Sequence, residues 1–354
     1  MASALNHHWC VGIDLHKDTL TACVYCRCCG EVTYRKLACK CRQQIADFFA
    51  GLPRPHTVAI ETVGFYRWLW DLLEPRVEKL MLADAREARA KAGRRLKTDR
   101  DDAYNIAELL ADGKLPQSYA PPMEVQLLRD LTRFRNGFSR QHARVLHRVK
   151  SIMNANNRPG PARLQSDGLT RYIRAQGSKL PSWHVAMLWH CVDQLNLTER
   201  QIDAAERTIG ELLHSERFQP LANRLMTFPG VALVTAATVI GEVGDFHRFP
   251  DSKTIARFAG LNPRIYNSGG KERLGHISKT GSPHLRWILQ QAAWTAIRTD
   301  ENVKFLFARI ARRSGRKAAA VAIARKLLTW MWGAVWNEQD YRSPGTRPLA
   351  ETVA

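Results

Sequence analysis

Four acidic residues stand where carboxylates can gather around a metal ion. Asp14 lies at the end of one apolar run, WCVGIDL, and Glu61 ends another, TVAIE. Such runs predict buried strands. Asp99 and Asp102 are three residues apart in a predicted helix, which puts them on one helix face. Carboxylates gathered in this way repel one another unless a divalent cation lies between them, and that cation can polarise a phosphate.

Each acid also has an ordinary structural explanation. Asp99 suits a helix N-cap, and Asp102 suits the first turn of a helix, where a negative charge is favoured. Asp14 and Glu61 could simply be polar strand ends. The four acids together favour a metal site, and we expect it to hold Mg²⁺ or Mn²⁺, which prefer oxygen ligands.

A second segment, residues 264–281, reads RIYNSGGKERLGHISKTG and sets two serines among glycines and cations. Gly269 and Gly270 follow Ser268 and permit a backbone with positive φ. A serine in such a loop could attack a phosphodiester if its deprotonation were assisted. The same letters also describe a flexible, solvated loop beside nucleic acid, and this segment alone favours that simpler interpretation. Three of its cations can neutralise a phosphate: Lys271, Arg273 and Lys279.

The composition agrees with a nucleic-acid partner. The 354 residues carry a net charge of +20, which suits a polyanion bound through its phosphates. Apolar content of 45% and charged content of 24% describe a folded chain of two or three domains, not a disordered one. The longest apolar run, 231–240, is too short to cross a bilayer. Residues 1–10 do not resemble a secretory signal, so we expect a cytoplasmic protein without membrane contacts.

The acids must be positioned by an N-terminal sheet. Alternation and β-branched residues predict strands over 9–15, 19–27, 32–37, 57–60 and 79–83, with helices over 43–52 and 66–73. Seven of the eight cysteines lie between Cys10 and Cys41. Free thiols are the expected state in a cytosolic chain, although the pairs within 23–41 could face each other across a hairpin and bind zinc.

These patterns resemble a known family. GIDLHKDTL at 12–20, IETVGFY at 60–66 and KTDRDDA at 97–103 are similar to the RuvC-like, ribonuclease-H-type domain of DEDD insertion-sequence transposases. The resemblance implies that Asp14, Glu61, Asp99 and Asp102 are an acidic tetrad that binds metal and acts in catalysis. Sugar kinases and related ATPases also open on strand, Asp, turn and strand. They need a Gly- and Thr-rich phosphate loop, which residues 15–18 do not provide.

The middle of the chain predicts helices with basic faces. Residues 121–157 and 184–214 carry apolar side chains at helical spacing, which favours antiparallel pairing within or between chains. Residues 158–181 are rich in Gly, Pro and Ser and predict a linker or an irregular insertion. Further on, 225–240 has the pattern of a helix-hairpin-helix, in which Pro229 and Gly230 make the bend and the second helix start could hold a phosphate. Residues 309–316 predict a basic loop.

The C-terminal third resembles the transposase domain of the same family. The matching stretches are PGVALVTAATVIGEVGDFHRF, FAGLNPRIYNSGG and GHISKTGSPHLR, within 225–286. The resemblance implies a serine nucleophile, which the NSGG pattern assigns to Ser268. Ser278 is the alternative, although it better suits a cap of the following helix or a phosphate contact. The family also implies active sites shared between subunits of a homodimer or homotetramer, and a structured guide RNA that pairs with DNA.

We therefore predict a DNA transposase or recombinase with four parts. These are a ribonuclease-H-like α/β domain at 1–118, a helical coiled-coil region at 119–218, a mainly helical transposase domain at 219–340 and a flexible tail at 341–354. The alternative is a metal-dependent junction resolvase without serine chemistry. The residues predicted to contact nucleic acid are Arg94, Arg95, Lys97, Arg140, Arg144, Arg148, Lys271, Arg273, Lys279, Arg286, Arg312, Arg313 and Arg316.

Overall fold

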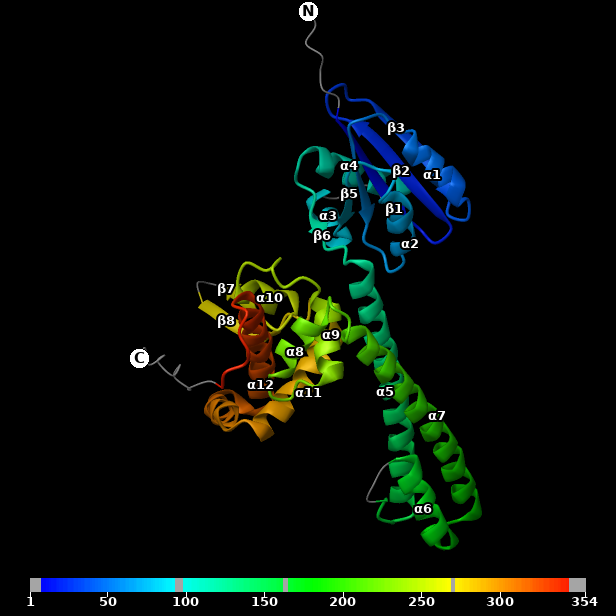
Figure 1. Ribbon diagram of the computed structural model, residues 1–354, viewed down its shortest axis with the longest axis vertical. Coiled ribbons are helices and arrows are strands. Elements are labelled where there is room, and N and C mark those ends of the chain that lie inside the picture. The colour runs from blue at the N-terminus through cyan, green and yellow to red at the C-terminus, as the bar shows by residue number, and fades with distance from the viewer. Residues whose placement is uncertain (1–7, 93–97, 162–164, 269–270, 344–354) are drawn as a thin grey trace, which may run out of the picture. The chain divides into compact units, whose positions relative to one another are not determined.

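The chain folds into two compact units, residues 1–120 and 121–354 (Figure 1). The computed structural model describes residues 8–92, 98–161, 165–268 and 271–343. The N-terminal unit is a mixed sheet with helices, and the C-terminal unit is almost entirely helical. The α/β-plus-α architecture expected from the sequence is therefore confirmed at this level.

The N-terminal sheet has six strands in the order β3-β2-β1-β4-β5-β6. Strands β1 (Trp9–Leu15), β2 (Thr19–Cys26) and β3 (Val32–Ala38) form an antiparallel meander. β4 (His56–Glu61) lies parallel to β1, β5 (Leu80–Ala83) lies parallel to β4, and the short β6 (Gln117–Ser118) closes the sheet antiparallel to β5. Residues 10–15 of β1 and 56–60 of β4 are all buried, as expected for strands covered on both faces.

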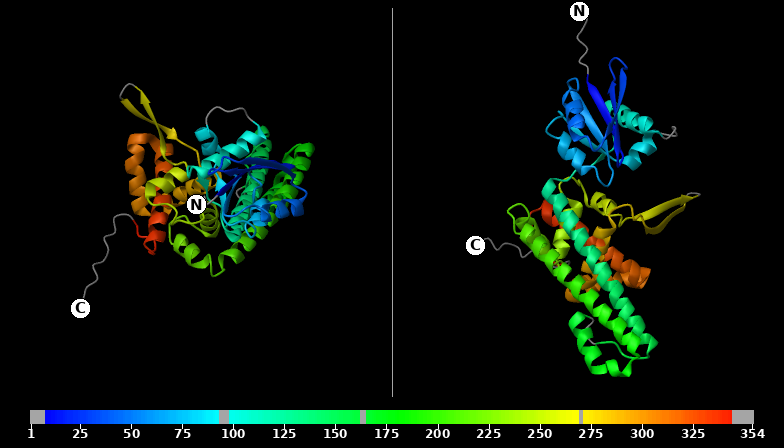
Figure 2. Two further views of the ribbon diagram at one scale, coloured as in Figure 1. Left: turned by 90° about the horizontal axis from the view of Figure 1, so that it is seen from above. Right: turned by 90° about the vertical axis from the view of Figure 1, so that its right-hand side faces the viewer.

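Helices cover both faces of this sheet. Ile45 and Phe49 of α1 (Arg42–Ala50) and Leu69 and Leu73 of α2 (Arg67–Leu73) join a core built on one face. On the other face, α4 (Asp99–Ala111) packs through its small residues Ala103 and Ala107. The remaining helix of this unit, α3 (Ala85–Ala92), contacts α4. Figure 2 shows the sheet and its helices from two further sides.

The cysteine pairs do not meet. The β2–β3 turn sits beside Cys26, whereas Cys39 and Cys41 follow the opposite end of β3, where the backbone of Cys39 bonds Asp18. A zinc site across this hairpin is therefore wrong, because an antiparallel hairpin holds the two pairs at opposite ends. The eight cysteines all lie within the described residues, and none of them forms a disulfide.

A long helical hairpin opens the C-terminal unit. Contacts between α5 (Met123–Ala155) and α7 (Ser182–Leu213) pair Arg135 with Glu206 near one end and His142 with Glu199 further along. Residue numbers rise along one helix as they fall along the other, so the pair is antiparallel. The expected linker at 158–181 contains α6 (Ser166–Gln176) and a short 3₁₀ turn at Gly177–Lys179. That expectation was wrong because Leu169 and Ile173 form a buried helical face.

The rest of the unit is a helical core with one hairpin of strands. Its helices are α8 (Gln219–Met226), α9 (Leu233–Val243), α10 (Ser252–Phe258), α11 (Pro283–Thr299) and α12 (Glu301–Trp336). Between α8 and α9, Gly230 has φ +78° and a Cβ there would lie 2.4 Å from the Ala292 carbonyl oxygen. The turn therefore requires glycine at this position.

Two expected loops are regular structure. Residues 264–281 contain strands β7 (Pro263–Ser268) and β8 (Lys271–Ile277), with Ser268 opposite Lys271. The expected basic loop at 309–316 lies inside α12, where two helices meet at Gly315, with φ 78° and ψ 158°. The expected loop is therefore wrong except at this one glycine, whose positive φ separates the two helices.

The end of the described chain is docked rather than free. The hydroxyl of Tyr341 donates to Asp300 at 2.9 Å, and the hydroxyl of Ser343 donates to the same carboxylate. The expected flexible tail is therefore wrong for residues 341–343, and 344–354 lie outside the described residues. Within α12, Arg316–Trp336 has the length and hydropathy of a membrane span. Half of that window is buried inside the unit, as in a core helix.

Candidate metal and nucleic-acid site

Asp14 is the buried centre of the acidic group. It is the next-to-last residue of β1 and its exposed fraction is 2%. Burial is the main reason that its pKa is raised. Its Oδ2 atom is buried and has no hydrogen-bond partner. A buried carboxylate oxygen left in this state is costly, which makes it a good position for a cation.

Glu61 lies beside Asp14 because their strands run parallel. Ile60 pairs with Ile13, so the residues that follow, Glu61 and Asp14, end neighbouring strands at one edge of the sheet. The two carboxyl groups share a hydrogen bond. Burial, that hydrogen bond and the Asp14 charge raise the pKa of Glu61 to about 7, and Asp102 contributes a further negative charge. The Glu61 carboxyl group therefore retains a proton that a bound cation would displace.

Neither Asp99 nor Asp102 is the N-cap of α4. Thr98 is the N-cap, and its hydroxyl accepts a hydrogen bond from the backbone N–H of Asp101 at 3.2 Å. The explanation of Asp99 as the cap is therefore wrong. Asp99 and Asp102 project from the first turn, and both charges act on Asp14. The structure thus brings all four predicted acids together.

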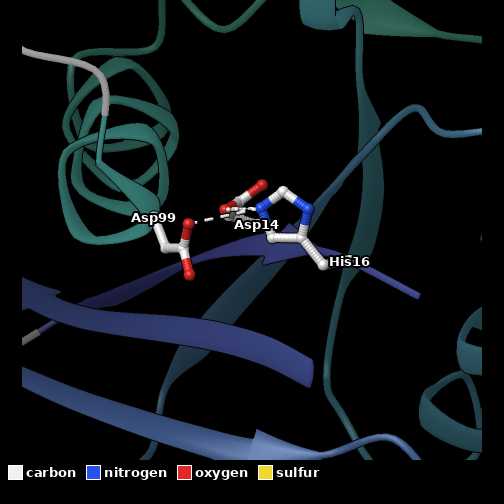
Figure 3. A group of neighbouring side chains, drawn as sticks. All are labelled: Asp14, His16 and Asp99. Carbon is white, nitrogen blue, oxygen red and sulfur yellow. Dashed lines mark ion pairs between the residues drawn. The ribbon is translucent and has the colours of Figure 1, made fainter. Parts of the chain in front are cut away.

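Two cationic side chains and one histidine lie beside these acids. Lys36 of β3 contacts Asp99 at 2.9 Å, and this contact is the largest cause of the lowered pKa of Asp99. Arg89 of α3 lies 3.4 Å from Asp102. The Nε2 atom of His16 lies 3.0 Å from Asp14 Oδ2 and 3.4 Å from Asp99 Oδ1 (Figure 3). His16 is not among the predicted site residues, although its position two residues after Asp14 places it at the same sheet edge.

These residues fit a divalent cation. Asp14, His16 and Asp99 offer ligand atoms that all lie within 4.8 Å of one another. The donor set combines carboxylates with one imidazole, and the buried Oδ2 atom of Asp14, which has no hydrogen-bond partner, is suited to bind a cation. The described residues thus contain a candidate divalent-metal site, with Glu61 hydrogen-bonded to Asp14 and the negative charge of Asp102 beside it.

The predicted serines occupy different settings. Ser268 is the last residue of β7, and its side chain lies outside the described part of the structure. The hydroxyl of Ser278 donates to Asn262 Oδ1 at 2.8 Å. The helix α11 is capped by Ser282, whose hydroxyl accepts from Leu285 N, so the expected capping role of Ser278 is wrong. Ser278 instead fixes the turn before that helix.

Two domains of IS110-type insertion-sequence transposases match the chain. A DEDD-type family of IS110 elements, described as Transposase, matches residues 11–156. The Transposase IS116/IS110/IS902 family matches residues 222–307. Together the matches cover more than half of the chain and include both predicted catalytic regions. The chain belongs to this family of insertion-sequence transposases.

Curated relatives agree with this membership. The chain is 28% identical to the probable family 20 transposase of Pseudomonas aeruginosa over 348 aligned residues. The aligned region covers 95% of this chain and 98% of the relative. The chain is 29% identical over 264 residues to the transposase for insertion sequence element IS1111A of Coxiella burnetii, covering 70% and 68%. The corresponding protein for IS1533 of Leptospira borgpetersenii is 25% identical over 333 residues, covering 89% and 92%. The protein is accordingly an enzyme of DNA strand transfer.

The basic residues predicted to bind nucleic acid fall into three groups in the transposase. Seven have exposed side chains: Arg140, Arg144, Arg148, Lys279, Arg312, Arg313 and Arg316. Arg286 differs, because its guanidinium donates to the backbone carbonyls of Ala259 and Gly281 and holds the turn before α11. Arg94, Arg95 and Lys97 lie outside the described residues, as do the side chains of Lys271 and Arg273.

Proposed function

We propose that this transposase cuts and rejoins DNA at a divalent-metal site formed by Asp14, Glu61, Asp99 and Asp102. The observation that carries the proposal is the meeting of two strand-end carboxylates with two acids of one helix turn. An antiparallel meander extended by parallel strands, with acids at the ends of β1 and β4, supports a ribonuclease-H-like assignment of the N-terminal unit. Such a domain performs phosphodiester chemistry.

Each acid has a distinct task in this proposal. Asp14 and Asp99 would hold the ion, Mg²⁺ or Mn²⁺, and Glu61 and Asp102 would complete the negative environment. When bound, the ion would polarise a DNA phosphate and stabilise entering and leaving oxygens. Lys36 and Arg100 line a hollow of about 470 Å³ beside Asp99, where their charges can hold the DNA backbone.

A serine supplies the covalent step. The Oγ atom of Ser268 attacks a DNA phosphorus, the new O–P bond forms as the bond to the departing strand breaks, and the serine proton ends on the departing strand's oxygen. Attack by the hydroxyl of a second DNA strand then breaks the bond between Oγ and phosphorus, returns a proton to Oγ and rejoins the DNA. The NSGG sequence within the matched transposase region supports this assignment. Ser278 is a weaker candidate because its hydroxyl is already bonded to Asn262.

The acid site is tested by single substitutions that remove charge and keep shape. Asp14→Asn should lower strand exchange between element ends and target by about 100-fold or more, because it removes charge stabilisation in the transition state. Asp18→Asn is the matched control, since Asp18 is exposed in the turn next to the site. Equal activity of the two variants would contradict the metal-site role of Asp14.

The proposed partners are DNA, a structured guide RNA and further copies of the chain. The charge of +20 accommodates both nucleic acids, and active sites shared across a homodimer or homotetramer would join Ser268 to the acids. We place this activity in the cytoplasm, at the bacterial nucleoid. Purification after nuclease-free lysis should yield one discrete RNA, encoded next to the gene. Purified protein that exchanges strands without any RNA would contradict the guide.

A metal-dependent junction resolvase is the second candidate. It is favoured by one observation: all four acids belong to the N-terminal unit, so the acidic site is assembled without any residue of 121–354. In that case Ser268 would be scaffolding. A Ser268→Ala variant separates the two, because a resolvase would keep its cleavage activity and a serine recombinase would lose it.

A further inference from the structure

We propose that His16 is a nitrogen ligand of the divalent metal and makes the site prefer Mn²⁺ over Mg²⁺. This inference rests on the proposed metal site. His16 lies in the turn between β1 and β2, and its ring reaches back over the end of β1. Figure 3 shows its Nε2 atom facing the carboxylates of Asp14 and Asp99, with a dashed line to each.

The separations match the edges of a coordination sphere. Metal–ligand bonds of about 2.1 Å place neighbouring ligands of an octahedral ion about 3.0 Å apart. Nε2 lies 3.0 Å from Asp14 Oδ2 and 3.4 Å from Asp99 Oδ1. Small side-chain shifts would therefore allow one ion to bind all three atoms.

A simple ion pair explains this arrangement less well. The contact between Nε2 and Asp14 Oδ2 is short, yet that oxygen has no hydrogen-bond partner. The two atoms therefore approach each other without the direction of a hydrogen bond. Asp99 already has Lys36 at 2.9 Å and does not need a second cation. A shared ion would satisfy the buried oxygen of Asp14 and use the His16 lone pair.

The nitrogen ligand changes which metal is preferred. Carboxylate-only sites suit Mg²⁺, which demands oxygen ligands and loses water reluctantly. Imidazole binds transition metals more strongly, and Mn²⁺ accepts both ligand types. We therefore expect the transposase to bind Mn²⁺ at least about tenfold more tightly than Mg²⁺, and His16→Gln to lose most of that difference. Because the His16 side chain is 57% exposed, this substitution should leave the fold intact.

The experiment measures Mn²⁺ bound to the full-length protein by pulsed electron paramagnetic resonance, together with Mn²⁺ and Mg²⁺ affinities by calorimetry. The expected result is a nitrogen modulation of the Mn²⁺ signal that disappears in His16→Gln and persists in His190→Gln. His190 is an exposed histidine on α7 and serves as the control.

Asp14→Asn separates the two levels of the proposal. If Mn²⁺ binding depends on Asp14 but shows no nitrogen signal, and His16→Gln keeps the metal preference, the role of His16 is refuted while the acidic site stands. If the wild-type protein binds Mn²⁺ no better than Asp14→Asn does, both the acidic metal site and its histidine ligand are refuted.

Discussion

Gly12 of β1 and Ala103 of α4 approach so closely that no side chain fits between their backbones. A Cβ atom on Gly12 would lie 2.1 Å from the carbonyl oxygen of Ala103. Atoms this close must move apart, so glycine is required for helix α4 to lie directly on the sheet. The same approach carries the first turn of α4, with Asp99 and Asp102, to the end of β1 where Asp14 lies.

Gly12→Ala should therefore disrupt both packing and the acidic group. We expect a loss of about 1–3 kcal/mol in the free energy of unfolding, the usual cost of forcing a methyl group into a packed core. Urea unfolding in metal-free buffer measures this loss, and calorimetry should show weaker Mg²⁺ binding.

Gly64→Ala is the control for this substitution. A Cβ at Gly64 would have no heavy atom within 4 Å, and Gly64 follows Glu61 by only three residues. It should change the free energy of unfolding by less than about 0.5 kcal/mol. Equal effects of the two substitutions would contradict the close approach of α4 to β1.

The shared proton of Asp14 and Glu61 predicts a pH dependence. The pKa of Glu61 rises from 4.5 to about 7 on folding, so between these values the folded chain binds a proton that the unfolded chain releases. The free energy of unfolding of the metal-free protein should therefore fall as pH rises through this window. Glu61→Gln should remove the fall and be more stable at pH 8 by about 1–3 kcal/mol.

Urea unfolding of both proteins from pH 4 to pH 8 measures this difference. The two stabilities should converge towards the acidic end, where Glu61 is protonated in both states. Adding Mg²⁺ at pH 8 should stabilise the wild type more than Glu61→Gln. A wild-type stability that tracks the variant across the whole range would show that Glu61 does not carry the proton.

Arg133 and Glu242 form an ion pair that fastens α9 to α5. The guanidinium donates to both carboxylate oxygens, at 2.7 and 2.9 Å, and Glu242 is 3% exposed. Arg133→Ala would leave a buried carboxylate unpaired, so we expect the free energy of unfolding to fall by about 3 kcal/mol. Lys304→Ala breaks the exposed pair with Glu301 and should cost less than about 1 kcal/mol. Similar losses in urea unfolding would contradict this role of the buried pair.

The sequence predicted those features of the transposase that follow from local pattern. Asp14 and Glu61 could be placed because apolar runs predict strands, and parallel strands end at one edge of a sheet. Gly12 and His16 could not be recognised in this way, since their roles depend on which helix crosses β1 and where the turn folds back. The helix at 166–176 was missed because flanking Gly, Pro and Ser dominated its composition, although Leu169 and Ile173 mark a buried face.

Trapping a covalent protein–DNA adduct shows whether Ser268 attacks DNA with help from the acidic site. End-labelled element DNA would be incubated with the transposase, its guide RNA and Mg²⁺, then resolved on a denaturing gel. We expect a protein-linked DNA band for the wild type and for Ser278→Ala, a band weakened about 100-fold by Asp14→Asn, and none for Ser268→Ala. If Ser268→Ala gives a band as strong as that of the wild type, or exchanges strands at the full rate, Ser268 is not the nucleophile.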